Sequence, residues 1–156
     1  MKKIIFLDFD GVLVTNRYQE EQIASGGVLR DSHGAVFDPV CIENLRHIID
    51  STDADIVAIS TWKMDLGLSG IQSMWKERNL PGIVAGVTPD IDIICRGNEI
   101  EAWLSGSDDE CRYAIIDDAP LSGFFNADQE DHLFRVDERI GLDAATAKRI
   151  VEHLNR

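Results

Sequence analysis

The sequence predicts an α/β fold built on a parallel sheet, and three observations support this prediction. Short apolar runs alternate along the chain with segments whose apolar residues recur at helical spacing. The first run, Lys3–Leu7, is apolar on almost every residue, which is typical of a strand buried on both faces of a parallel sheet. Residues able to do chemistry follow four of the runs: Asp8, Ser60, Thr88 and Asp117. Because parallel strands end at one edge of their sheet, we expect these side chains to converge there.

Five runs rich in branched or aromatic residues are the predicted strands. They are Lys3–Leu7, Ile56–Ile59, Ile83–Ala85, Tyr113–Ile116 and the weaker His132–Val136. Each is too short to be an independent helix and stops at a polar or turn-forming residue. With helices between them, they favour parallel pairing through right-handed crossovers.

Four segments with a helical apolar period are the predicted helices. They begin at Pro39, cover about Leu66–Arg78 and Arg96–Leu104, and close the chain after Asp143. The first is the best marked, because the Asp38 side chain can cap the first turn and Pro39 suits its first position. Cys41 and Leu45 then fall on one apolar face.

The segment Thr15–Phe37 shows no helical period and contains three glycines. Val28-Leu29 and Ala35–Phe37 flank a polar turn, which predicts a short hairpin. A structureless loop of this length would be unusual inside a compact domain. We therefore interpret residues 15–37 as a small flap over the site, and we expect residues 1–156 to form one domain.

Composition and charge limit the class of protein. The chain has 156 residues, of which 44% are hydrophobic, and a formal net charge of −13. It contains no apolar run long enough to span a membrane, and its three cysteines show no Cys-x-x-Cys spacing, so we expect a cytoplasmic protein. The acidic charge argues against extended nucleic-acid binding. A small phosphorylated substrate is still compatible, because a divalent cation held by aspartates can reverse the local field.

Asp8 and Asp10 stand at the mouth of the first strand, with Gly11 directly behind them. Two carboxylates at the end of a buried strand are costly unless a metal, a proton or hydrogen bonds compensate them. Glycine lets the backbone turn sharply and approach a ligand. A solvated turn is the alternative, but the apolar Val12–Val14 would then have to provide a second strand. The pair therefore suggests a catalytic carboxylate site.

The sequence resembles the haloacid dehalogenase (HAD) superfamily at three motifs. Asp8–Leu13 resembles motif I, Ser60 after an apolar strand resembles motif II, and Ile115–Asp118 resembles motif IV. The resemblance implies a three-layer α/β/α, Rossmann-like fold with a parallel sheet of about five strands and a hairpin flap in place of a large cap. Further features are similar to the HAD domain of Swiss Army Knife RNA repair proteins: Ser60–Lys63, Gly86–Pro89, Arg96–Leu104 and Gly141-Leu142.

This resemblance implies a role for each carboxylate. Asp8 would be the nucleophile that forms an aspartyl-phosphate, and Asp10 the general acid and base. The second aspartate implies phosphoryl transfer rather than dehalogenation. Mg²⁺ would be held by the side chains of Asp8 and Asp117 and by the backbone carbonyl of Asp10. Asp118 would bind it directly or through water, or would instead orient a neighbour or cap a helix.

The resemblance also implies groups that bind the phosphoryl oxygens. Ser60 would donate a hydrogen bond, with Thr61 as its rival. Motif III usually supplies a lysine, and here the best candidate for this cation is Arg96, which keeps the charge but cannot transfer a proton. Lys63 is the competitor and could instead contact substrate; a surface ion pair is the alternative for both. The loop at Thr88 would take part in substrate selection, whereas we interpret Trp62 and Trp103 as core residues.

The expected function is therefore that of a Mg²⁺-dependent phosphohydrolase, a phosphomonoesterase of the HAD type. A nucleic-acid-end phosphatase in RNA or DNA repair is one alternative, and a non-catalytic phosphate-binding module on the same fold is another. A phosphotransferase is not distinguished from a phosphatase by these residues. The expected partner is a phosphorylated small molecule or a phosphorylated nucleic-acid end.

Overall fold

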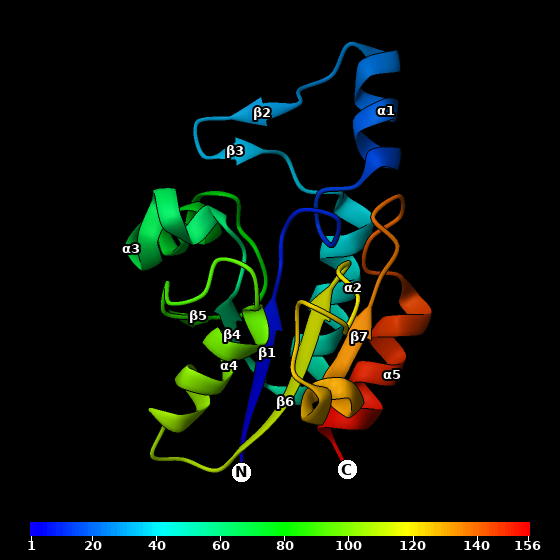
Figure 1. Cartoon of the computed structure of the whole chain (residues 1–156). Coiled ribbons are helices and arrows are strands. Elements are labelled where there is room, and N and C mark those ends of the chain that lie inside the picture. Colours follow the sequence, from blue (N-terminus) through cyan, green and yellow to red (C-terminus); the bar gives the residue numbers. More distant parts are fainter.

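A computed structural model describes residues 1–156. Five parallel strands form one sheet in the order β5-β4-β1-β6-β7, and helices cover both of its faces (Figure 1). The strands are β1 (Lys2–Leu7), β4 (Asp55–Ala58), β5 (Val84–Val87), β6 (Cys111–Asp117) and β7 (Leu133–Arg135). The helices are α1 (Asn16–Ser25), α2 (Pro39–Thr52), α3 (Trp62–Glu77), α4 (Arg96–Ser105), the 3₁₀ helix η1 (Ala127–His132) and α5 (Ala144–Leu154). None of the helices is both long and apolar enough to cross a membrane.

The predicted parallel α/β sheet is confirmed, and β1 lies at its centre. β1 pairs with β4 on one side and with β6 on the other. The chain builds the sheet outward from β1 through β4 and β5, and then returns to add β6 and β7 on the opposite side. This reversal makes the carboxyl end of β1 the topological switch point, where open α/β sheets bind their ligands.

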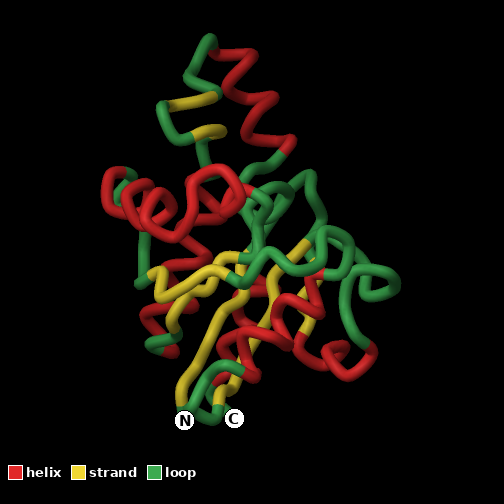
Figure 2. Tube along the Cα trace, turned by 60° about the vertical axis from the view of Figure 1, so that its left-hand side comes forward, coloured by secondary structure: helices red, strands yellow, loops and turns green.

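The alternation of side chains along β1 divides the core into two layers. Ile5 and Leu7 face the larger layer, which α2, α3 and α5 cover. Ile4 and Phe6 face the smaller layer, which also contains Ile100 of α4 and Phe125. Figure 2 shows helices on both sides of the sheet. All four side chains of β1 are fully buried, as the apolar run predicts for a central strand.

The interpretation of Thr15–Phe37 as a hairpin without a helix is wrong in one respect, because α1 occupies its first part. No residue of α1 is buried, so the helix carries no apolar stripe that a periodic pattern could reveal. Its ends are set by local signals instead. The Thr15 side chain accepts a hydrogen bond from the backbone N–H of Tyr18, and Gly26 closes the helix in a left-handed conformation.

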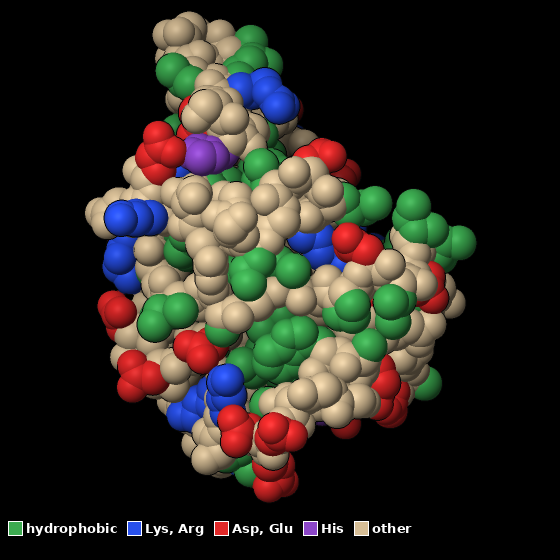
Figure 3. Space-filling view, turned by 90° about the vertical axis from the view of Figure 1, so that its left-hand side faces the viewer, with side chains coloured by type: hydrophobic (Ala, Val, Ile, Leu, Met, Phe, Trp, Pro, Cys, Tyr) green, Lys and Arg blue, Asp and Glu red, His purple; other side chains and the backbone are tan.

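The predicted hairpin is present, as β2 (Arg30–Asp31) and β3 (Gly34–Ala35), and it contacts the C-terminal end of α3. Arg78 at the end of α3 donates to both carboxylate oxygens of Asp31, at 2.8 and 2.7 Å. His33 also contacts Glu77. With α1, the hairpin forms a flap that projects from the body of the molecule (Figure 3).

Helix α3 begins at Trp62, four residues before the predicted start at Leu66. Gly67 has a non-helical backbone (φ 64°, ψ 179°) and kinks the helix, so the apolar period of the second part does not extend into the first turn. The predicted segment corresponds mainly to the part after the kink. The short first turn brings Trp62 and Lys63 to the carboxyl edge of the sheet.

The ion pair between Arg78 and Asp31 predicts an acid-sensitive anchor for the flap. Hydrogen bonds from Arg78 hold the pKa of Asp31 at about 2, below its ordinary value. A lowered folded-state pKa stabilises the fold above the unfolded pKa, and this contribution is lost as the pH falls toward 2. We expect Asp31→Asn to lower the unfolding free energy by about 0.5–1 kcal/mol near neutral pH, because the pair is partly exposed.

Urea unfolding of the wild type, Asp31→Asn and the exposed control Asp108→Asn would measure this difference. The difference between the wild type and Asp31→Asn should shrink once the pH is below the ordinary pKa of aspartate. A difference that is as large in acid as near neutrality would contradict this origin of the stability.

Candidate active site

Asp8 lies at the carboxyl end of β1, where its backbone N–H still donates to the carbonyl of Ile116 at 3.0 Å. The residue is 2% exposed. Beyond it the chain turns back at Gly11, whose N–H donates to the carbonyl of Val14 and whose φ is +80°. A Cβ atom at Gly11 would lie 2.3 Å from Oδ2 of Asp118. Glycine therefore satisfies the turn and also leaves room for the Asp118 carboxylate.

Three carboxylates meet beside this turn. Asp8, Asp117 and Asp118 each offer one oxygen atom, and these atoms lie within 4.8 Å of one another. Asp117 is fully buried at the end of β6, directly beside β1. Arg96, the first residue of α4, bridges two of them: its Nη1 lies 3.0 Å from Oδ2 of Asp8 and 2.5 Å from Oδ2 of Asp117.

Burial, followed by interactions with Asp117, raises the pKa values of Asp8 and Asp118. Burial raises the pKa of Asp8 well above its usual range, and the charge of Asp117 raises it further, although Arg96 lowers it. Burial likewise raises the pKa of Asp118 to about 6, helped by its hydrogen bond and charge interaction with Asp117. Burial would lower the pKa of Arg96, but Asp8 and Asp117 raise it above its usual value. The guanidinium therefore stays charged and offsets only part of the negative charge.

This donor set fits a hard divalent cation. Carboxylate oxygens are the protein ligands that Mg²⁺ prefers, and it typically completes its octahedron with water and substrate phosphate. The three clustered oxygens are close enough to share one ion, and the negative charge left uncompensated by Arg96 would stabilise it. Asp8, Asp117 and Asp118 are thus the side chains that could hold such an ion.

Asp10 lies outside this cluster and is exposed. Its Oδ2 accepts a hydrogen bond of 3.2 Å from the indole Nε1 of Trp62. The Trp62 ring packs against Phe9 and Phe37, with centroids 5.5 and 5.7 Å away. The interpretation of Trp62 as a core residue is therefore incomplete, because its indole N–H also donates a hydrogen bond to Asp10. Trp103, by contrast, packs edge-on against Phe6 within the smaller core layer, as expected.

Ser60 and Thr61 follow β4 at the same edge of the sheet. Ser60 is fully buried, and its Oγ accepts a hydrogen bond of 3.3 Å from the backbone N–H of Trp62. Thr61 is exposed and directly precedes α3. Both positions agree with the order of the motifs, and their roles in binding a phosphoryl group stay predictions.

Lys63 and Thr88 belong to a separate buried network. The Lys63 ammonium donates to the carbonyl and hydroxyl oxygens of Thr88, at 3.0 and 3.1 Å, and lies 3.0 Å from carboxylate oxygens of both Asp90 and Glu99. Arg96, and not Lys63, contacts Asp8. A direct substrate contact by Lys63 or Thr88 stays a prediction.

Glu99 was missed by the sequence analysis. It is 5% exposed, on the buried side of α4, where its pairing with the distant Lys63 and hydrogen bonds from the backbone N–H groups of Ile91 and Asp92 compensate the buried carboxylate. A glutamate in the first turn of a helix ordinarily indicates a favourable interaction with the helix dipole, so nothing in the local pattern marks it.

Comparison with protein families gives a match to the model of the HAD domain in Swiss Army Knife RNA repair proteins, over residues 4–147. The match includes all the carboxylates described above. No curated protein and no solved structure matches the chain.

The crowded carboxylates predict a specific response to Mg²⁺. At a concentration of about 100 times its Kd, a ligand that binds only the folded state adds about 2.7 kcal/mol of stability. For a chain of this size we expect the unfolding midpoint to rise by about 5–10 °C. Asp8→Asn removes one ligand and one repelling charge, so its midpoint without metal should equal or exceed that of the wild type. Its midpoint should respond little to Mg²⁺.

Thermal unfolding monitored by circular dichroism, with and without Mg²⁺, would measure these shifts. Asp109→Asn, in an exposed loop, is the matched control and should respond as the wild type does. Equal Mg²⁺ shifts in wild type and Asp8→Asn would rule out Asp8 as a ligand.

Proposed function

The chain belongs to the family of HAD domains in Swiss Army Knife RNA repair proteins, and on that premise we propose that it is a Mg²⁺-dependent phosphomonoesterase. The observation that carries the proposal is the meeting of Asp8, Asp117 and Asp118 with Arg96 at the carboxyl edge of the sheet. A buried carboxylate facing a fixed guanidinium suits a nucleophile that must approach an anionic phosphoryl group.

In the first step, an oxygen of Asp8 attacks phosphorus and the bond to the substrate alcohol breaks. The product on the protein is an aspartyl-phosphate. Arg96, whose Nη1 lies 3.0 Å from Oδ2 of Asp8, would also contact the phosphoryl oxygens and stabilise their charge. Ser60 and Thr61 would donate hydrogen bonds to the same oxygens. Mg²⁺ on Asp8, Asp117, Asp118 and the backbone carbonyl of Asp10 would neutralise phosphoryl charge.

Asp10 is the proposed proton carrier in both steps. It gives a proton to the departing alcohol oxygen, and it then takes a proton from the water that attacks the aspartyl-phosphate. The second attack releases inorganic phosphate and restores the Asp8 carboxylate. The hydrogen bond from Trp62 would fix the direction of the Asp10 carboxylate during these transfers. Trp62 is in this sense a positioning residue.

A phosphorylated nucleic-acid end is the second candidate substrate, and the RNA repair proteins that define the family favour it. The net charge of −13 argues against a long nucleic-acid footprint. On the face drawn in Figure 3, lysine and arginine side chains are interspersed with acidic ones rather than gathered into a band. Recognition of a nucleic acid would then be limited to the nucleotides at its end.

The phosphatase proposal predicts Mg²⁺-dependent release of phosphate from a generic phosphomonoester. Chelation of Mg²⁺ or the substitution Asp8→Asn should lower kcat by about 100-fold or more, because each removes a group required for the first step. Equal turnover by the wild type with Mg²⁺, the wild type with chelated Mg²⁺ and Asp8→Asn would refute the mechanism.

Oligonucleotides with a 3′- or 5′-phosphate, compared with free nucleotides, would separate the two substrate classes. Binding of Mg²⁺ and phosphate without turnover would instead indicate a non-catalytic module.

The contact between Trp62 and Asp10 predicts a rate effect of Trp62→Phe. Phenylalanine keeps most of the packing against Phe9 and Phe37 but removes the indole N–H donor. We expect kcat to fall by about 10-fold with little change in KM. Trp103→Phe makes the same chemical change in the other core layer and should leave both unchanged. A similar fall in kcat for both variants would indicate a structural effect alone.

A further inference from the structure

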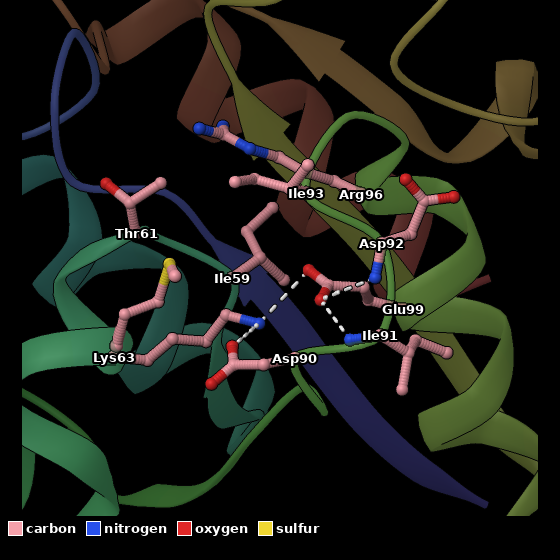
Figure 4. Close-up of a pocket in the computed structure, with 10 residues that line it drawn as sticks. Ile59, Thr61, Lys63, Asp90, Ile91, Asp92, Ile93, Arg96 and Glu99 are labelled. Atoms are coloured by element: carbon pink, nitrogen blue, oxygen red, sulfur yellow. Dashed lines mark hydrogen bonds and ion pairs between the residues drawn. The ribbon is translucent and has the colours of Figure 1, made fainter.

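A cavity of about 320 Å³ opens beside Arg96, on the side of α4 that faces α3 (Figure 4). Its lining joins two groups of the proposed active site, Thr61 and Arg96, to the loop that connects β5 to α4. Thr61 also lines the neighbouring hollow that contains Asp10. An oxygen atom bound near Thr61 would thus lie between this cavity and the proposed proton donor. The volume is at the lower end of the range for small-molecule sites.

The cavity has an apolar wall made of Ile59, Met64, Ile91 and Ile93. Ile59 is a buried part of this wall, whereas Ile93 is 85% exposed. Ile93 lines the same cavity as Arg96, which belongs to the proposed phosphoryl site (Figure 4). If an apolar group of a ligand covered this exposed isoleucine, apolar surface would be removed from water, and this would favour binding.

The charged groups of the cavity already have partners. Lys63 is held by Glu99 and by Asp90, each at 3.0 Å. The Asp92 carboxylate accepts hydrogen bonds from the backbone N–H groups of Ile94 and Cys95 and from the side chain of Asn98. Arg96 points to Asp8 and Asp117. No unpaired cation is thus left for a second anionic group, and the lining carries three carboxylates against two cations.

The loop that contributes Ile91 and Ile93 to the apolar wall is held in place by buried side chains. Glu99 accepts hydrogen bonds from the backbone N–H of Ile91 at 3.0 Å and of Asp92 at 3.4 Å. Lys63 binds the Thr88 carbonyl at the start of the same loop. Because both side chains are buried and paired, the wall is positioned before any ligand arrives, and little ordering is needed on binding.

We infer that this cavity binds the alcohol part of the phosphomonoester and selects an uncharged, apolar group of about one ring in size. This inference rests on the proposed function, in which Asp8 and Arg96 take the phosphoryl group. A substrate with a second phosphate or a carboxylate on its alcohol part would place that anion against the carboxylates of Asp90, Asp92 and Glu99. Such substrates would be repelled by these carboxylates, and their anionic groups would make no favourable apolar contact with Ile91 and Ile93.

Calorimetric titration with two phosphonates tests the inference without requiring turnover. In the presence of Mg²⁺, we expect benzylphosphonate to bind the wild type at least about 10-fold more tightly than 2-carboxyethylphosphonate. Ile93→Lys places a cation in the apolar wall, so it should reduce this preference by about 10-fold or reverse it. Ile94→Lys is the matched control, because Ile94 is 67% exposed in the same loop but does not line the cavity.

Equal affinity for the two phosphonates, or no binding of either, would overturn the inference. So would an effect of Ile94→Lys as large as that of Ile93→Lys. Turnover of benzyl phosphate and 3-phosphoglycerate, both esters of primary alcohols, tests the proposed function separately. Selective binding of benzylphosphonate without hydrolysis of any ester would support the apolar subsite and refute the phosphatase activity. Hydrolysis of both esters at equal rates, with equal binding of the two phosphonates, would support the phosphatase activity and refute the apolar subsite.

Discussion

The contact of Arg96 with Asp8 and Asp117 is the interaction on which the candidate site depends. Two buried carboxylates on neighbouring strands would repel each other strongly without a positive charge between them. One guanidinium offsets part of this charge; burial raises the pKa values of Asp8 and Asp118, and the charge of Asp117 raises both further. The fold thus carries a local electrostatic cost where a cation and a phosphoryl group would meet.

The sheet makes this crowding unavoidable and keeps it in place. β1 and β6 are adjacent and parallel, so Asp8 and Asp117 end side by side at one edge. Gly11 then turns the chain back so closely that any Cβ would meet the Asp118 carboxylate. The apolar core on both faces of β1 stabilises the arrangement, because the side chains of Ile4 to Leu7 are fully buried on either side of the strand that leads to Asp8.

Much of the sheet and the carboxylate cluster could be predicted, because both follow from local patterns along single strands. An apolar run that stops at Asp8 or Asp117 predicts a strand and places the carboxylate at its end. The exposed helix α1 could not be found in this way, since it buries nothing. Likewise, the pairing of Lys63 with Glu99 and of Trp62 with Asp10 joins distant segments. Only the packing of α3 and α4 on the sheet brings those residues together.

The first turn of α3 divides the surroundings of the site into two chemically different parts. Successive residues of a helix point about 100° apart, so Trp62 and Lys63 leave this turn in different directions. Trp62 meets Asp10 and packs against the flap, where Arg30 and His33 make a polar hollow. Lys63 meets Glu99 and supports the loop with Ile91 and Ile93. Thr61 lines both the polar hollow and the cavity beside Arg96. The proposed proton transfer and the proposed recognition of the alcohol would therefore take place on different sides of this single helical turn, which the kink at Gly67 keeps short.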